Sequence, residues 1–243
     1  MLCTFRNVIA NTNSVEQNIA YRQLATKSND LKSWFIKIVQ ITQIYVLPSP
    51  YDLMETPPNK RKWKKLVTDS VNLYWSLKLK NEVNSKTTLK YLNVDDVMIG
   101  KTHNIWYSGG AEPYAVNRSC VKAKLACGTY TLQKDRSKFS KHSASTTCQL
   151  CKSEPEDRLH FLVKCKALEE IRTPFINKLR GYLIDIICPN LIQELLDNSD
   201  NLLQFIIDCS KFHVLSLNQQ HRIEKIAAGL CFNLHQKRAS LLL

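Results

Sequence analysis

Three cysteines and one histidine stand close together in the sequence, at spacings typical of metal ligands. Cys148 and Cys151 are separated by two residues, His160 follows after eight more, and Cys165 after a further four. Two thiolates two residues apart fit a tight turn that points both sulfurs at one ion, and zinc binds four such ligands in a tetrahedron. Three sulfurs and one imidazole nitrogen fill that shell. The spacing therefore predicts one structural Zn²⁺ with no open position at which water could be activated.

His160 and Cys165 can bind the same ion only if the backbone between them has a particular conformation. His160 and Cys165 are five residues apart, which corresponds to about 140° around a regular α-helix. Both side chains reach one ion only if a helix begins at or near His160 and frays by Cys165. Asp157 has two candidate roles, as the N-cap of that helix or as the acceptor for the second imidazole N–H, and the cap is favoured. The alternative to a metal site is a chance Cys-x-x-Cys beside an ordinary core His and Cys.

The elements that must position these ligands are predicted to be helices. Apolar residues recur at helical spacing along most of the chain, and no convincing run of strands interrupts them. The signals predict helices from the capping box at Ser14 to about 25, over 31–42, from Thr56-Pro57 to about Val83, over 116–125, from Thr173-Pro174 to about 186, near 190–197 and 200–210, and after Ser216. The segment 134–147 is polar and basic, and we expect it to be exposed.

These patterns predict an all-α protein, an irregular helical array with a small Cys3His zinc-knuckle-like module. The predicted parts are an N-terminal helical region over 1–93, a loop-rich bridge and basic helix over 94–147, the knuckle over 148–166, and a C-terminal helical lobe over 167–243. No apolar run approaches the roughly 20 residues of a membrane span, and the N-terminus lacks the features of a signal peptide. We therefore expect a nuclear or cytoplasmic protein that is neither secreted nor membrane-bound.

The positive charge of the chain is concentrated in its middle third. Residues 58–147 hold 17 Lys and Arg against six Asp and Glu, so they account for nearly all of the net charge of +13. Such asymmetry indicates a polyanionic partner, and the second of the two basic clusters leads directly into the predicted knuckle. The candidate phosphate-binding residues are Lys60, Arg61, Lys62, Lys64, Lys65, Arg118, Lys122, Lys124, Lys134, Arg136, Lys138 and Lys141.

Aromatic residues are interleaved with these cations. Trp63 lies within the first cluster and is expected to join an apolar stripe, whereas Tyr130 and Phe139 could either stack on unpaired bases or pack in the core. The competing interpretation of each cluster is an ordinary solvated helix face.

The residues around the knuckle resemble a known family. Glu156-Asp157-Arg158-Leu159-His160 through Cys165, following Cys148-x2-Cys151, is similar to the C-terminal zinc-binding segment of non-LTR (LINE-type) retrotransposon reverse transcriptases. The resemblance extends to Trp63-Lys64-Lys65, Thr88 to Asn93, Lys122 to Leu125, Gly128 to Gln133 and the tail Leu234 to Arg238. It implies a segment that holds template RNA or target DNA beside a polymerase.

The chain departs from that family at the Asp residues that a polymerase needs for catalysis. Asp95-Asp96 is its only Asp-Asp pair, but the aromatic residue that should precede it is missing, and no partner Asp in a strand setting lies upstream. Two divalent ions could therefore not be held for phosphoryl transfer. The prediction is a non-catalytic fragment without its polymerase, which binds RNA or DNA with little sequence preference. The alternative is a structural or protein-interaction helical module in which zinc only holds the fold together.

Overall fold

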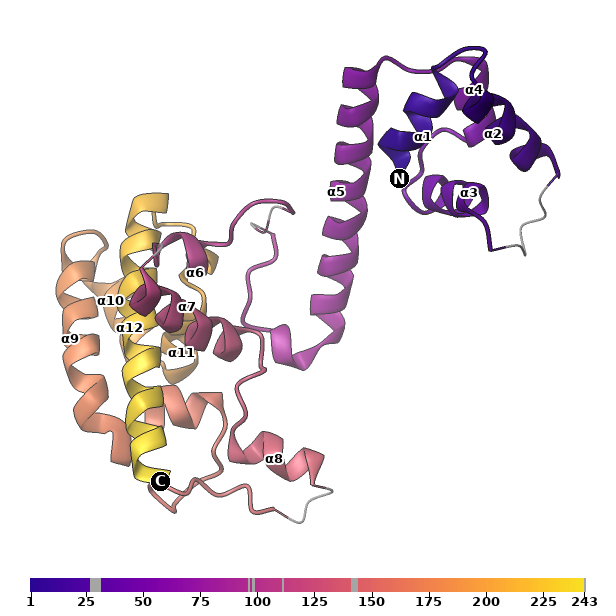
Figure 1. Cartoon of the computed structure of the whole chain (residues 1–243). Helices are drawn as coiled ribbons and strands as arrows, with labels where there is room; N and C mark the ends of the chain where they lie inside the picture. The colour runs from indigo at the N-terminus through magenta and orange to yellow at the C-terminus, as the bar shows by residue number, and fades with distance from the viewer. Residues whose placement is uncertain (27–31, 96, 98, 111, 141–143, 243) are drawn as a thin grey trace. The chain divides into compact units, whose positions relative to one another are not determined.

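The structure of the chain, a computed structural model, describes residues 1–26, 32–95, 97, 99–110, 112–140 and 144–242. Within these ranges every regular element is a helix, and the only β-type pairing is an isolated antiparallel bridge between Thr147 and Pro155 (Figure 1). The predicted all-α fold with a Cys3His module is confirmed. The chain divides into two compact units, Met1–Leu79 and Lys80–Leu243. The four-part division over 1–93, 94–147, 148–166 and 167–243 stays a prediction.

The N-terminal unit is a small helical cluster with its own core. Its core side chains come from every helix of the unit, with Phe5, Ile9, Ile38 and Trp63 almost completely buried. The elements are α1 (Leu2–Ile9), α2 (Val15–Thr26), α3 (Trp34–Ile44), α4 (Pro50–Glu55) and the first part of α5 (Lys60–Ser85). At the start of α2, the Gln17 N–H donates to the Ser14 hydroxyl, and the Asn13 N–H donates to the Gln17 side-chain carbonyl. The predicted helix start at Ser14 is therefore confirmed.

The long helix α5 begins later than the sequence pattern predicted. Its cap is Asn59, whose side-chain oxygen accepts a hydrogen bond of 2.9 Å from the Arg61 N–H, so the predicted start at Thr56-Pro57 was wrong. Trp63 is only 1% exposed, as predicted for a member of the apolar stripe. Leu66 and Leu77 from the same predicted stripe are exposed, so the buried face of α5 is narrower than its spacing suggested.

The C-terminal unit is built around the long helix α12. This helix packs against α6, α7 and α9, and α11 lies against α10 and α7 (Figure 1). The elements are η1 (Thr87–Leu89), α6 (Asn104–Tyr107), α7 (Pro113–Ala126), α8 (Gln133–Phe139), η2 (His160–Lys164), η3 (Lys166–Leu168), α9 (Glu169–Ile184), α10 (Pro189–Asp197), α11 (Ser199–Ile207), η4 (Cys209–Lys211) and α12 (Leu217–Leu242). Among the described residues, no helix combines the length and apolar character that crossing a membrane requires.

Two predicted boundaries in this unit are corrected. The segment 134–147 was expected to be only an exposed stretch, but α8 occupies its first half and buries Ser137 on one face. The helix expected to restart at Thr173-Pro174 begins at Glu169 instead, and Pro174 lies inside it. Proline lacks one backbone donor, which removes one hydrogen bond of α9 without ending the helix.

Two buried ion pairs connect α12 to the rest of the unit. The Lys122 ammonium on α7 pairs with the Glu224 carboxylate, and both side chains are almost completely buried. The Arg238 guanidinium donates to both carboxylate oxygens of Glu156, at 2.7 and 2.9 Å. Glu156 also accepts from the Gln133 backbone N–H at 2.9 Å. The C-terminal helix is therefore attached to the segment that precedes His160 and to the start of α8.

Candidate metal centre

A tight turn brings Cys148 and Cys151 to the same side of the backbone. The Cys148 N–H donates to the Glu154 carbonyl at 2.8 Å, and the Lys152 N–H donates back to the Cys148 carbonyl at 2.9 Å. Lys152 completes the turn with a φ of +57°, in the left-handed region that only a few per cent of non-glycine residues occupy. The bridge between Thr147 and Pro155 closes the base of the turn.

A π-helical turn brings His160 and Cys165, five residues apart, to the same side of the backbone. The segment His160–Lys164 is π-helical, and the Cys165 N–H donates to the His160 carbonyl at 2.7 Å. A hydrogen bond between residues five apart closes a wider turn than that of an α-helix, so both side chains lie on one side. The sequence predicted a fraying α-helix at this place, whereas the structure has a regular but wider turn.

The four predicted ligands converge on one point. One ligand atom from each of Cys148, Cys151, His160 and Cys165 lies within 4.8 Å of all the others. The Cys148 and Cys165 sulfurs are 3.9 Å apart, and the Cys151 sulfur is 3.2 Å from His160 Nε2. Two thiolates on one tetrahedral zinc are separated by about 3.8 Å, given a Zn–S bond of about 2.3 Å. The cluster can therefore hold one metal ion in a closed shell.

Burial and hydrogen bonding divide the three thiols into two kinds. Burial, together with the charge of Cys148, raises the pKa of Cys165 to about 12, and burial raises the pKa of Cys148 as well. Burial acts the same way on Cys151, but hydrogen bonds from the Ser153 hydroxyl and N–H outweigh it and lower the pKa of Cys151 to about 6. A metal ion bound by all three sulfurs takes the place of the thiol protons.

Two carboxylates support the histidine in different ways. The Asp157 carboxylate accepts from the His160 backbone N–H at 3.0 Å, so the favoured prediction that Asp157 caps this helix is confirmed. The outer-shell role belongs to Glu154, whose carboxylate lies 3.2 Å from His160 Nδ1. A proton on Nδ1 leaves Nε2 free to face the metal. Sequence reasoning missed Glu154, because a glutamate six residues before a histidine carries no local signal.

Glu154→Gln is expected to weaken metal binding while leaving all four ligands in place. An amide accepts the imidazole proton less strongly than a carboxylate and can present its N–H₂ group instead, so the ring is held and polarised less well. Loss of such a partner typically costs 10- to 100-fold in metal affinity. Competition against a chromogenic zinc chelator measures this loss.

Glu170→Gln is the matched control for that experiment, since Glu170 is an exposed glutamate at the start of α9. It removes the same charge without touching His160, and its affinity should equal that of the unmodified protein. Equal affinities for both variants would show that Glu154 does not support the metal site.

The predicted nucleic-acid residues of the second cluster include one buried residue and two that are already paired. Lys122 is 0% exposed, so its prediction as a phosphate contact was wrong. It pairs with the carboxylate of Glu224, 102 residues away, and no local sequence pattern predicts that contact. Lys134 pairs with Asp157 at 3.0 Å, and Lys138 lies 3.9 Å from Asp135.

The other members of the second cluster differ in their exposure. Lys124 and Arg136 are exposed, whereas Arg118 is half-buried with its guanidinium 4.2 Å from the ring centre of Tyr114. Lys141 lies outside the described residues. Of the two aromatic candidates in this region, Tyr130 is buried and stacks on Phe161, whereas Phe139 is 85% exposed. Core packing is therefore the role of Tyr130, and only Phe139 remains available to a base.

The first cluster keeps all of its predicted residues on the surface. The exposed side chains are Lys60, Arg61, Lys62, Lys64 and Lys65. None of them has an ion-pair partner among the described residues. Trp63 stands among them and is turned inward, where its indole N–H donates to the Leu2 carbonyl at 3.2 Å. The Arg6 side chain also donates to the Pro58 carbonyl at 2.8 Å, which fixes α1 to the residues before α5.

Asp95 has an ordinary surface environment. Its side chain is 79% exposed and lies 3.2 Å from the Lys80 ammonium, and Asp96 lies outside the described residues. The absence of catalysis stays a prediction. The chain matches no protein-family model, no curated protein and no solved structure.

Proposed function

We propose that this chain is a non-catalytic, zinc-containing protein that binds RNA or DNA with little sequence preference. The metal we assign to the cluster is zinc, because three thiols and one imidazole suit a tetrahedral ion that is structural rather than reactive. When bound, the ion holds the turn at Cys148 and the π-helical turn together. The resemblance to the C-terminal region of non-LTR retrotransposon reverse transcriptases supports the same proposal.

The observation that carries the proposal is the group of five cations at the start of α5, which have no ion-pair partner among the described residues. The positive end of the helix dipole disfavours cations in the first turn, and like charges at neighbouring positions repel one another. The buried Trp63 holds this turn in place, so the cations cannot disperse by fraying of the helix. Phosphate groups would remove the repulsion and release counterions on binding.

Affinity for RNA and DNA is expected to fall steeply with salt. If about six phosphates are neutralised, log affinity should fall against log salt with a slope near −5 on duplex DNA and near −4 on single strands. Changing the five cations of residues 60–65 to Ala should reduce that slope. Fluorescence anisotropy titrations at several salt concentrations measure both slopes.

The matched control loses the same number of charges from other exposed helix positions. It carries Ala at Lys37, Lys166, Lys178, Arg180 and Lys225. This variant should keep most of the slope, since its net charge equals that of the α5 variant and only the location differs. Equal slopes for the two variants, or a flat salt response of the unmodified protein, would overturn the proposal for α5.

A second candidate function is a protein-interaction module, favoured by one apolar cavity in the C-terminal unit. This cavity of about 350 Å³ lies between α10, α11 and the segment before α12, and its lining includes Leu191, Phe212 and Val214. Val214 is well exposed. A protein that uses only this surface would bind no polyanion, and the salt titration separates the two functions.

A further inference from the structure

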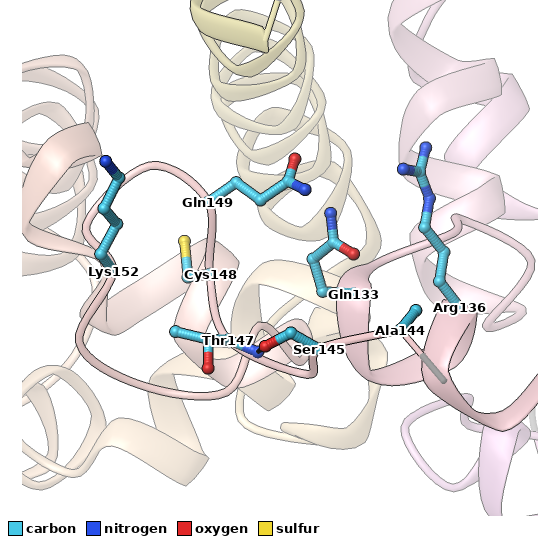
Figure 2. Close-up of a pocket in the computed structure, with 8 residues that line it drawn as sticks. All are labelled: Gln133, Arg136, Ala144, Ser145, Thr147, Cys148, Gln149 and Lys152. Atoms are coloured by element: carbon cyan, nitrogen blue, oxygen red, sulfur yellow. Dashed lines mark hydrogen bonds between the residues drawn. The ribbon is translucent and has the colours of Figure 1, made fainter. Parts of the chain in front are cut away.

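A second cavity lies directly beside the metal-ligand cluster. It has a volume of about 520 Å³, within the usual range for small-molecule sites. One wall is α8, which contributes Gln133 and Arg136, and the opposite wall is the knuckle turn, which contributes Gln149 and Lys152. Figure 2 shows the two glutamine side chains reaching into the same space, with Lys152 at one end and Arg136 at the other.

The charge of this cavity favours an anion. Arg136 and Lys152 are both exposed, and neither has an ion-pair partner among the described residues. Among the lining residues that the structure describes, none carries a carboxylate. The nearby acidic side chains are already engaged, because Glu154 contacts His160 and Asp157 pairs with Lys134. An anionic ligand would therefore meet two cations at the cavity and no opposing charge in the part of its lining that the structure describes.

Gln133 indicates that the ligand also carries hydrogen-bond acceptors. Its side chain lines the cavity, the residue is only 3% exposed, and its amide nitrogen has no hydrogen-bond partner among the described residues. A buried donor without a partner costs about 1–3 kcal/mol, so native proteins keep few of them. The amide of Gln149 lies on the other side of the same space (Figure 2). A carboxamide presents donors and an acceptor together, which suits the edge of a nucleobase.

Lys152 is the second residue of this cavity whose local state is unfavourable. A lysine in the left-handed region is strained, at a cost of order 1 kcal/mol, where glycine would not be. Like the amide of Gln133, it is a poor choice for stability alone. A ligand that uses both side chains accounts for both costs.

We propose that this cavity binds one unpaired nucleotide of a single-stranded nucleic acid. Arg136 and Lys152 hold its phosphate groups, and the amides of Gln133 and Gln149 hydrogen-bond the edge of its base. Bases in single strands are open to such contacts, whereas the same edges are less accessible within a duplex. This inference deepens the proposed function and rests on it, because the cavity would add contact with a base to the electrostatic attraction supplied by α5.

The first test uses Gln133→Met, which keeps the length of the side chain, changes no charge and removes the unpartnered donor. Affinity for single-stranded oligonucleotides should fall about three- to tenfold, the loss expected for one hydrogen bond. Affinity for duplex DNA should not change, and the melting temperature should stay equal or rise. Anisotropy titrations and thermal melts of the full chain give these values.

The second test combines Arg136→Gln with Lys152→Gly and compares it with Lys178→Gln combined with Arg180→Gln. Both double variants lose two charges, but Lys178 and Arg180 are exposed on α9, away from the cavity. The cavity variant should bind single strands at least about tenfold more weakly than the α9 variant, since it loses two phosphate contacts. Equal binding by the two would overturn the nucleotide site and leave the proposed function intact.

A third measurement tests the nucleotide site independently of the proposed nucleic-acid-binding function. NMR titration of the full chain with mononucleotides should shift the side-chain amide signals of Gln133 and Gln149, whereas inorganic phosphate should leave the Gln133 signal unmoved. A protein that binds no oligonucleotide contradicts the proposed function. If Gln133 and Gln149 then also fail to respond to mononucleotides, the cavity proposal is overturned independently. An identical response to inorganic phosphate would overturn the base contact.

Discussion

Removal of the metal, by a chelator or by Cys165→Ser, is expected to unfold the core of the C-terminal unit. Cys148, His160 and Cys165 are all buried, and both cysteines belong to the same apolar core as α7, α11 and α12. Structural zinc sites contribute apparent binding energies on the order of 10 kcal/mol to folding. Without the ion, buried thiols and an imidazole would remain in the core with few partners. Circular dichroism melts with and without chelator, together with metal analysis, measure the loss.

Cys188→Ser is the matched control for this prediction, because Cys188 is an exposed free cysteine in the same unit. It should retain one equivalent of zinc and the melting temperature of the unmodified protein. The N-terminal unit has its own core, which includes Trp63 and Trp34. In a Trp106→Phe background, which removes the tryptophan of the C-terminal unit, tryptophan fluorescence should therefore be little changed by the chelator. Protein without stoichiometric metal, whose melting is insensitive to chelation, would show that these four residues are not a structural metal site.

Lys122→Met is expected to destabilise the C-terminal unit by about 3–5 kcal/mol, the cost of leaving a buried charge without its partner. The remaining carboxylate of Glu224 is only 2% exposed, and its other close contacts are with the Cys209 thiol and N–H. The second change Glu224→Gln, which removes the unpaired charge, should recover much of this loss. Urea denaturation of the single and double variants gives the free energies of unfolding.

Lys124→Met is the control, since Lys124 is an exposed lysine two residues further along the same helix. Its change in the free energy of unfolding should stay within about 0.5 kcal/mol. A similarly small change for Lys122→Met would mean that the buried pair is not formed in solution.

Lys122 should not make stability pH-dependent near neutrality. Burial alone would lower the pKa of Lys122, but the charge of Glu224 outweighs it and raises the pKa above its ordinary value of 10.5. A raised lysine pKa stabilises the folded state fully at pH values below the unfolded-state pKa. The contribution is lost only as the pH rises through the higher, folded-state pKa.

The sequence by itself determined the four candidate metal ligands, the helical class and the inward position of Trp63. These features depend on residues close together in the chain: four ligands fall within one short window, and apolar spacing shows which side of a helix is buried. The cap at Asp157 was predictable for the same reason, because it acts on a backbone N–H three residues away.

Only the tertiary structure decided which charged residues face solvent and which hold the core together. Lys122 is one of three cations on α7 at closely spaced positions, yet it alone meets a carboxylate of α12, 102 residues away. Arg238 and Glu156 are separated by 82 residues and form a buried pair as well. The polar cavity at Gln133 likewise requires α8 and the knuckle turn to lie side by side. Contacts of this kind depend on how helices pack, because a charge can be buried only where packing supplies its partner.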